Sequence, residues 1–378
     1  VDALRTPSGR GKLSGALSSQ HPVDLFGTVL RELVARNELD PALIDDVIAG
    51  CLSQVGTQAV NIARNAALAA GFPVSVPGTT IDRQCGSSQQ AATFAAQGVI
   101  AGAYDIVIAG GIELMSSHPI GRAALGEDNW GPDVRSRFPD GLVGQGISAE
   151  LIAARWSLSR EALDEFAARS HRLAAAASFE SEILAIGDHS VDETIRPDTT
   201  AEGLAGLKPA FFDEALGQRF PEIQWRVTAG NSSPLTDGAS AVLIMSEERA
   251  DQLGLRPRAR FVSSAVVGSD PIEMLTGVIP ATHKILSRSG MAIGDFDTIE
   301  INEAFASVPL AWQQEFGVDP ERVNPRGGAI ALGHPLGSSG TRLLTTMLNE
   351  LERTGGRYGY QVMCEGAGMA NATIIERL

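Results

Sequence analysis

Short apolar runs bounded by glycine alternate with segments of helical periodicity along much of the chain. This alternation is typical of α/β proteins, in which helices cover the faces of a sheet. The clearest unit has a predicted strand at Val76–Ile81, a small-residue helix at Ser87–Gly98 and a buried strand at Asp105–Ala109. Gly110-Gly111 is predicted to end that second strand as a turn, and Cys85 stands where the first strand meets the helix.

A related unit lies near the C-terminus. Gly337-Ser338-Ser339 comes just before a predicted helix at Thr341–Arg353, and the apolar strand Tyr360–Met363 runs into Cys364-Glu365-Gly366. Gly86-Ser87-Ser88 opens the helix of the first unit at the matching place. We interpret the pattern as one duplicated α/β domain. The alternative is the strand-turn-helix repetition that every doubly wound fold contains.

The composition changes between the two units, over residues 116–225. This part is rich in turns and carries predicted helices at Ala149–Arg155 and Ser159–Phe179. A segment of this length with its own helices is too long for a plain loop. We therefore predict an inserted lid or subdomain.

Composition and charge narrow the function classes. The 378 residues are 44% hydrophobic and carry 30 basic against 45 acidic side chains, a net charge of −15, which disfavours nucleic acid and anionic membranes as partners. Three cysteines are too few and too scattered for a disulfide framework or a paired-cysteine metal site. No apolar run reaches the roughly 20 residues of a membrane-spanning helix. We expect a cytoplasmic protein with reduced thiols and no membrane insertion.

Two residues at element ends are candidates for nucleophilic chemistry. Cys85 would lie at a helix N-terminus, where unpaired N–H groups favour the thiolate and stabilise a nearby oxyanion; a buried structural thiol is the alternative. His334 is flanked by Gly333 and Pro335 in a glycine-rich stretch, so it could accept a proton from a thiol, although a lone histidine is more often structural.

Two further candidates stand at the ends of predicted strands. Cys364 would face the same pocket as Cys85 if the halves are related, and the small residues after it would leave backbone N–H groups free for an oxyanion. Asn302 could orient a water or an imidazole, or could merely cap a helix, while Glu303 is ambiguous. These residue types alone also fit a Cys/His/Asn hydrolase, which would need neither Cys364 nor a covering domain.

Five motifs and the chain's start together resemble the thiolases, the acyl-CoA C-acyltransferases. The motifs are Asp82-Arg83-Gln84-Cys85-Gly86-Ser87, Gly110-Gly111-Ile112-Glu113-Leu114-Met115-Ser116, Asn302-Glu303-Ala304-Phe305-Ala306, Gly327-Gly328-Ala329-Ile330-Ala331-Leu332-Gly333-His334-Pro335 and Cys364-Glu365-Gly366-Ala367-Gly368. The resemblance covers essentially the whole chain from Arg5. It implies a duplicated thiolase fold, in which two related mixed-sheet α/β halves form a five-layered α-β-α-β-α core with an inserted loop domain. The implied domains are 1–115 with 226–250, 116–225 and 251–378.

The resemblance also implies a role for each site residue. Cys85 would attack the acyl-CoA to form an acyl-enzyme, His334 would activate that thiol, and Cys364 would exchange a proton with the substrate α-carbon or the incoming CoA thiol. One oxyanion hole would combine His334 with a water on Asn302. A second would use the backbone N–H groups of Cys85 and Gly366.

Coenzyme A is implied as a substrate, with no permanently bound cofactor and no metal. The inserted domain would cover the CoA chain, and the residues implied or suggested to line its site are Ser233, Phe305, Gln145, Met274 and Arg226. Arg196 and Lys208 are further candidates for the CoA phosphates, with ordinary solvated surface as the alternative. The family is expected to form a homodimer or homotetramer. Val1 falls inside its first strand, so we expect a few residues to precede it.

Departures from the family pattern bear on the substrate. Asp82, Pro234 and Glu365 replace commoner residues, and Met274-Leu275 replaces a common Met-Gly. Gly144-Gln145-Gly146 stands where short-chain enzymes have His-Met-Gly, which favours a bulkier acyl group. We therefore predict a degradative 3-ketoacyl-CoA thiolase. The alternatives are a biosynthetic enzyme that condenses two acetyl-CoA molecules, and a non-catalytic acyl-CoA-binding protein.

Overall fold

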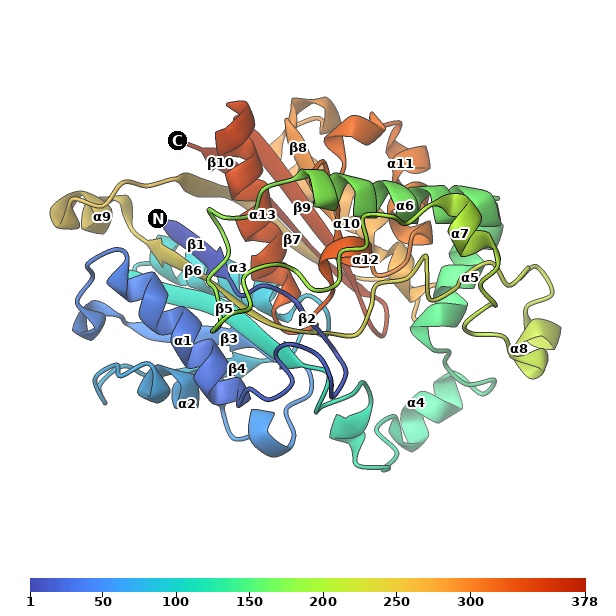
Figure 1. The fold of residues 1–378 in the computed structure, drawn as a ribbon, viewed down its shortest axis with the longest axis horizontal. Helices are drawn as coiled ribbons and strands as arrows, with labels where there is room; N and C mark the ends of the chain where they lie inside the picture. Colours follow the sequence, from blue (N-terminus) through green and yellow to red (C-terminus); the bar gives the residue numbers. More distant parts are fainter.

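The computed structural model describes every residue from Val1 to Leu378 and contains two α/β halves (Figure 1). The first half consists of β1 (Asp2–Arg5), β2 (Gly9–Arg10), α1 (Pro22–Ala35), β3 (Asp46–Gly50), α2 (Ile62–Ala69), β4 (Thr79–Ile81), α3 (Ser87–Ile100), β5 (Ile106–Leu114) and β6 (Thr236–Met245). After α9 (Glu247–Leu253), the second half consists of β7 (Ala259–Gly268), α10 (Val278–Ser289), β8 (Thr298–Ile301), α11 (Ser307–Phe316), α12 (Ala329–Leu332), α13 (Ser339–Thr354), β9 (Tyr358–Glu365) and β10 (Met369–Arg377).

Each half contains one mixed sheet, and the two sheets follow the same plan. The first sheet has the strand order β1-β6-β5-β3-β4, with β2 against β6, and the second has the order β7-β10-β9-β8. The pairs β3–β5 and β8–β9 are parallel, whereas β5–β6 and β9–β10 are antiparallel. The place of β4 is taken in the second half by a single parallel bridge between Ile299 and Val323. The predicted duplication is therefore confirmed.

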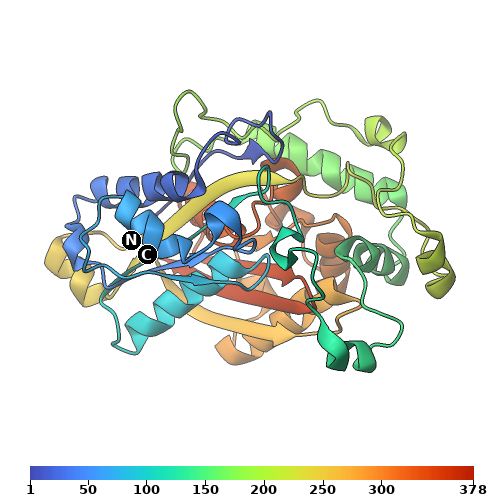
Figure 2. The same ribbon diagram turned by 90° about the horizontal axis from the view of Figure 1, so that it is seen from below.

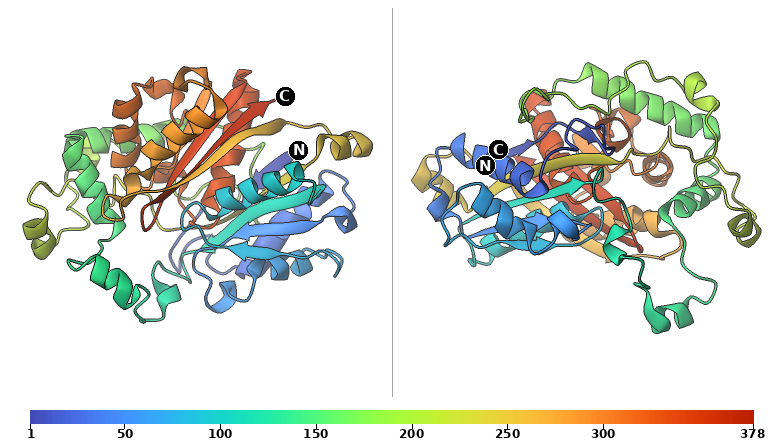
Figure 3. Two further views of the ribbon diagram at one scale, coloured as in Figure 1. Left: turned by 180° about the vertical axis from the view of Figure 1, so that it is seen from behind. Right: turned by 60° about the horizontal axis from the view of Figure 1, so that its bottom comes forward.

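Five layers result from the packing of helices on these sheets. Helices α3 and α13 contact each other and strands of both sheets, so they form the central layer. Helices α1 and α2 cover the outer face of the first sheet, and α10 and α11 cover that of the second. Figure 3, left, shows the orange and red strands of the second sheet above the blue and cyan strands of the first. The predicted five-layered fold is confirmed.

Small residues allow the two central helices to approach closely. Helix α3 begins with Ser87-Ser88 and α13 with Ser339-Gly340, and every residue from Ser339 to Leu351 is buried. A Cβ on Gly340 would lie 2.0 Å from the backbone nitrogen of Gln89. Glycine is therefore required where α13 crosses α3, which brings the N-terminal ends of both helices to one place.

The glycine pair 110–111 has a role that the sequence pattern misassigned. The predicted turn is wrong, because β5 continues through both residues to Leu114. A Cβ on Gly111 would lie 2.0 Å from the carbonyl oxygen of Gly337, and one on Gly110 would lie 2.5 Å from that of Ser240. Gly111 therefore allows the backbones of the two halves to approach, and Gly110 allows close approach to β6 within the first sheet, rather than permitting a turn.

Other predicted elements occur with shifted ends. The strand predicted at 76–81 is only Thr79–Ile81, and the helices predicted at 87–98 and 341–353 are Ser87–Ile100 and Ser339–Thr354. The last predicted strand extends to Glu365. Cys364 therefore lies within β9, one residue before its end.

Residues 116–225 add no strand to either sheet. They form α4 (Gly131–Arg137), α5 (Gln145–Arg155), α6 (Arg160–Ala176), α7 (Ala201–Ala205) and α8 (Glu214–Arg219). Helix α6 is capped by Ser159, whose hydroxyl accepts a hydrogen bond from Ala162 N, and it packs on α11 and α12. Figure 2 shows α4, α5 and α8 at the end of the molecule opposite the two termini. None of the helices in the chain combines the length and apolar content required to cross a bilayer.

Candidate active site

Two thiols meet where α3 begins and β9 ends. Cys85 lies just before α3 and is 2% exposed, and Cys364 is completely buried. The two are close enough that a charge on Cys85 raises the pKa of Cys364. The backbone N–H of Gly366 donates to the Cys85 sulfur, and Gln145 Nε2 lies 4.0 Å from that sulfur. The structure therefore brings four of the predicted site residues together.

The ionisation of Cys85 differs from the sequence-based expectation. A helix N-terminus favours a thiolate, but burial raises the pKa of Cys85 to about 12, with a further contribution from the Glu365 carboxyl. The hydrogen bonds from Gln145 and Gly366 only reduce this rise. At neutral pH the residue is a thiol, so it needs a base before it can act as a nucleophile.

His334 is held as a neutral imidazole with a defined tautomer. Its Nδ1 lies 2.6 Å from Ser339 Oγ, and the Ser339 hydroxyl donates to Pro335 O at 2.8 Å. Because that hydroxyl proton is used, the oxygen accepts from Nδ1–H, and the lone pair is assigned to Nε2. Burial, assisted by the Arg342 charge, lowers the pKa of His334 to about 3. The imidazole can therefore accept a proton at Nε2.

Asn302 contacts this base directly. It follows β8, and its Nδ2 lies 3.2 Å from His334 Nε2. Its Oδ1 is buried and has no hydrogen-bond partner within the protein. Asn302 does not cap the next helix, because α11 begins at Ser307 with Ala306 as its N-cap. The capping alternative is therefore excluded.

A small apolar cluster connects Cys85 with the segment that follows His334. Leu336, two residues after His334, belongs to the same buried group as Cys85, together with Met363 of β9. The His334 backbone N–H also donates to Thr236 Oγ1 at 3.0 Å, which anchors the loop on β6. Both halves of the fold therefore contribute to one buried site.

Glu303, which the sequence left ambiguous, supports the loop that carries His334. Its carboxylate accepts hydrogen bonds from Ser170 Oγ at 2.7 Å, Asn324 Nδ2 at 2.8 Å and Ile330 N at 3.1 Å. These donors belong to α6, to the segment before the glycine-rich loop and to α12. Glu303 therefore ties the inserted segment to the second half, and its role is structural.

Glu113 is a second buried anchor, which the sequence did not identify. Oε2 accepts from Leu52 N at 2.9 Å and Gly337 N at 3.0 Å, and Oε1 accepts from Ser53 N at 3.1 Å and Gln58 Nε2 at 2.9 Å. Burial raises the pKa of Glu113, and these donors offset that effect in part. The sequence offered one sign of this role, because Glu113 lies in the motif that begins at Gly110. The groups that donate hydrogen bonds to it could not be predicted, because they are distant in sequence.

The predicted substrate-side residues lie along two adjacent segments. Ser233 N donates to Ala304 O at 3.0 Å, and Ser232 forms a β-bridge with Phe305. Phe305 packs edge-to-face with Phe211, with ring centroids 5.8 Å apart. Met274 shares a buried cluster with Phe305 and Cys364. These contacts place the predicted lining residues beside the strand that carries the second thiol.

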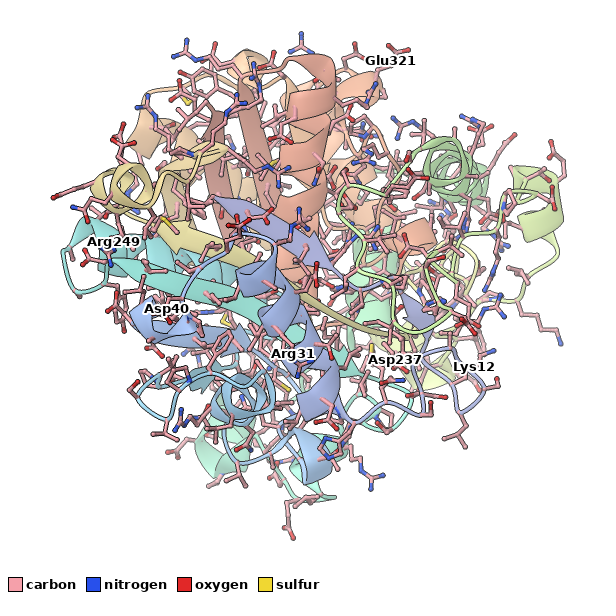
Figure 4. The ribbon with its side chains drawn as sticks, turned by 60° about the vertical axis from the view of Figure 1, so that its left-hand side comes forward. Lys12, Arg31, Asp40, Asp237, Arg249 and Glu321 are labelled. Atoms are coloured by element: carbon pink, nitrogen blue, oxygen red, sulfur yellow. The ribbon has the colours of Figure 1, made fainter.

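Cations are dispersed over the molecule. The guanidinium of Arg226 donates to the carbonyl oxygens of Ala153 and Leu158, whereas Arg196 and Lys208 are exposed on the inserted segment. Lys12 in the segment after β2, Arg31 on α1 and Arg249 on α9 lie apart from one another (Figure 4). No group of histidine, cysteine and carboxylate side chains is arranged to hold a metal ion.

The fold and the buried site define a duplicated α/β protein with a two-cysteine centre. Family models for the thiolase N-terminal domain and the thiolase C-terminal domain match residues 1–248 and 255–377. The chain belongs to the thiolase family and is an acyltransferase.

Individual relatives cover the chain completely. It is 49% identical to the steroid 3-ketoacyl-CoA thiolase FadA6 of Mycobacterium tuberculosis, over 100% of this chain and 93% of that protein. It is 43% identical to the 3-ketoacyl-CoA thiolase of Vibrio parahaemolyticus, over 100% and 97%. The crystal structure of the Bacillus anthracis acetyl-CoA acetyltransferase superposes with a TM-score of 0.87 at 40% identity, over 100% of this chain and 97% of that chain.

Proposed function

We propose that this protein cleaves 3-ketoacyl-CoA with free CoA, giving acetyl-CoA and a shortened acyl-CoA. The observation that carries the proposal is the pairing of Cys85 with Cys364 in one buried site, together with a neutral His334 whose Nε2 carries the lone pair and is contacted by Asn302. The relatives named 3-ketoacyl-CoA thiolase support this direction. If the protein were a Cys/His/Asn hydrolase, Cys364 would have no role in the reaction.

In this reaction Cys85, His334 and Cys364 have distinct roles. Cys85 attacks the 3-keto carbon while its proton passes to His334 Nε2. The bond between C2 and C3 breaks, the acyl group stays on Cys85, and the acetyl-CoA enolate takes its proton from Cys364. The Cys364 thiolate next accepts the proton of the incoming CoA thiol, which attacks the acyl-enzyme and releases Cys85. The leaving Cys85 sulfur takes back its proton from His334 Nε2.

Two oxyanion sites separate the charges that develop. The protonated Nε2 of His334, with a water held on Asn302, would stabilise the enolate; the unpartnered Oδ1 of Asn302 is an available acceptor for that water. The backbone N–H groups of Cys85 and Gly366 would stabilise the tetrahedral intermediate. The hydrogen bond from Gly366 N to the Cys85 sulfur supports this assignment.

We assign residues 116–225 to a loop domain that covers CoA, between an N-terminal domain (1–115 with 226–250) and a C-terminal domain (251–378). Ser233 and Phe305 would line the pantetheine tunnel, and Gln145 and Met274 the acyl pocket. The relative named as a steroid thiolase supports an acyl group larger than acetoacetyl. We further propose a homodimer or homotetramer in the reducing cytoplasm.

A thiolysis profile tests the proposal. The full-length protein is assayed with CoA and 3-ketoacyl-CoA substrates of increasing length, including branched and ring-bearing chains. We expect turnover to exceed that with acetoacetyl-CoA for at least one larger substrate, and Cys85→Ala to abolish both turnover and the acyl-enzyme mass increase. Exclusive activity with acetoacetyl-CoA would favour the biosynthetic alternative, and normal turnover by Cys85→Ala would overturn the mechanism.

A further inference from the structure

Glu365 places a carboxyl group without a partner inside the site. It ends β9 directly after Cys364 and is completely buried. Neither of its carboxyl oxygens has a hydrogen-bond partner in the protein. A buried carboxyl normally acquires donors or an ion pair, because leaving it without either costs several kcal/mol. Glu113 and Glu303 obey this rule with four and three donors.

The carboxyl group lies against the residue that follows the nucleophile. A Cβ added to Gly86 would be 1.9 Å from Glu365 Oε1 and 2.8 Å from its Cδ. Gly86 is the N-cap of α3, a helix of 14 residues. The partial positive charge of that helix end favours an anion beside it and so offsets part of the effect of burial on the carboxyl group.

Few other charges face this carboxyl group. Burial is the largest influence and raises the pKa of Glu365 well above its usual value; from the segment between β4 and α3, Arg83 partly opposes this rise and Asp82 adds to it. Cys364 precedes it on its own strand, and Cys85 lies across from it. Arg83 forms no ion pair with Glu365, so no cation neutralises a second negative charge in this space.

We propose that Glu365 is a positioning residue for the nucleophile: its carboxyl and the Cys85 thiol compete for one negative charge, and Cys85 ionises only while Glu365 keeps its proton. Like charges in a buried site do not both form, so the two groups titrate as a pair. A charged Glu365 therefore holds Cys85 as a thiol, whereas a protonated Glu365 allows the Cys85 proton to pass to His334 when substrate is bound. This inference deepens the proposed function, on which it rests.

Alkylation of Cys85 by iodoacetamide tests the pairing without any CoA substrate. The rate is measured from pH 6 to pH 10 for the full-length protein, and the modified peptide is located by mass spectrometry. Glu365→Gln keeps the shape and removes the charge. We expect its profile to move toward acid by about one pH unit or more, which is about tenfold faster alkylation at pH 8.

Asp105→Asn is the control, because it removes an exposed carboxylate at the opposite end of α3 from Cys85. Its profile should coincide with that of the wild type to within about twofold. An unchanged profile in a folded Glu365→Gln protein would overturn the proposal. If that variant does not fold, Glu365→Ala must give the same displacement, and its absence overturns the proposal equally. Failure of the wild type to cleave any 3-ketoacyl-CoA would instead defeat the proposed function and leave the alkylation result intact.

Discussion

His334 and Ser339 are linked by a hydrogen bond of 2.6 Å between Nδ1 and Oγ, across the first turn of the chain that leads into α13. The Ser339 hydroxyl is itself committed to Pro335 O, so it can only accept from the imidazole. This contact determines which ring nitrogen is available as a base. The orientation of the proposed catalytic base therefore depends on a serine five residues further along the chain.

Ser339→Ala should impair proton transfer more than substrate binding. Without the acceptor, the buried imidazole loses the bond that favours Nδ1–H, and the tautomer with a protonated Nε2 becomes populated. We expect kcat for thiolysis to fall by about 10–100-fold with little change in KM, as for other lost orienting partners of histidine. Ser339→Thr keeps the hydroxyl and should restore most of the rate. Equal losses in both variants would contradict the tautomer argument.

Replacement of the Glu113 carboxylate should reduce the stability of the folded protein. Glu113→Gln would place an amide NH2 group where one carboxylate oxygen now accepts two hydrogen bonds, so two hydrogen-bond donors would face a donor in either orientation. We expect the free energy of unfolding to fall by about 3–5 kcal/mol, the usual cost of leaving a buried network broken. Urea unfolding measures this change. The exposed Glu127→Gln is the control and should change stability by less than about 0.5 kcal/mol.

Much of this fold could be predicted from the sequence, because strand and helix periodicity are local signals. The paired Gly-Ser-Ser helix starts indicated the duplication, and their packing at Gly340 explains it. The role of the glycines at 110–111 could not be predicted, because the backbone they accommodate at Gly337 is distant in sequence. For the same reason, Ser339 and the raised pKa of Cys85 required the tertiary structure.

Asp237 on β6 predicts a dependence of stability on pH. Its Oδ2 is buried without a partner, and burial raises its pKa from 3.8 to about 6. Between these pH values the folded protein binds more protons than the unfolded chain, so stability decreases as pH rises through this window and stays reduced above it. Asp237→Asn keeps an oxygen that can accept from Ser116 N and removes the charge.

We expect Asp237→Asn to be more stable than the wild type by about 3 kcal/mol at pH 7, since each unit of pKa shift corresponds to about 1.4 kcal/mol. At pH 4 most of that gain should disappear, because the wild-type side chain is then protonated in the folded protein. Urea unfolding at the two pH values measures the difference. A gain of the same size at both would show that ionisation is not its cause; the exposed Asp198→Asn is the control.

Substitutions at residues 144 and 145, in the proposed acyl pocket, should change the substrate specificity. A Cβ added to Gly144 would meet no other atom within 4 Å, so a histidine side chain can be accommodated there, and Gln145 contacts the Cys85 sulfur. The double variant Gly144→His with Gln145→Met introduces the residues found in short-chain thiolases and should fill the space next to the nucleophile. We expect the ratio of kcat/KM for acetoacetyl-CoA to that for a long 3-ketoacyl-CoA to increase by about 10-fold or more, a difference of about 1.4 kcal/mol in transition-state binding.

The measurement compares both substrates in the same protein preparation, so a general loss of activity cancels. The single variant Gly206→His, at an open glycine on the inserted segment, controls for the added side chain. An unchanged ratio in the double variant would place the determinant of acyl length elsewhere, with Met274 as the next position to substitute.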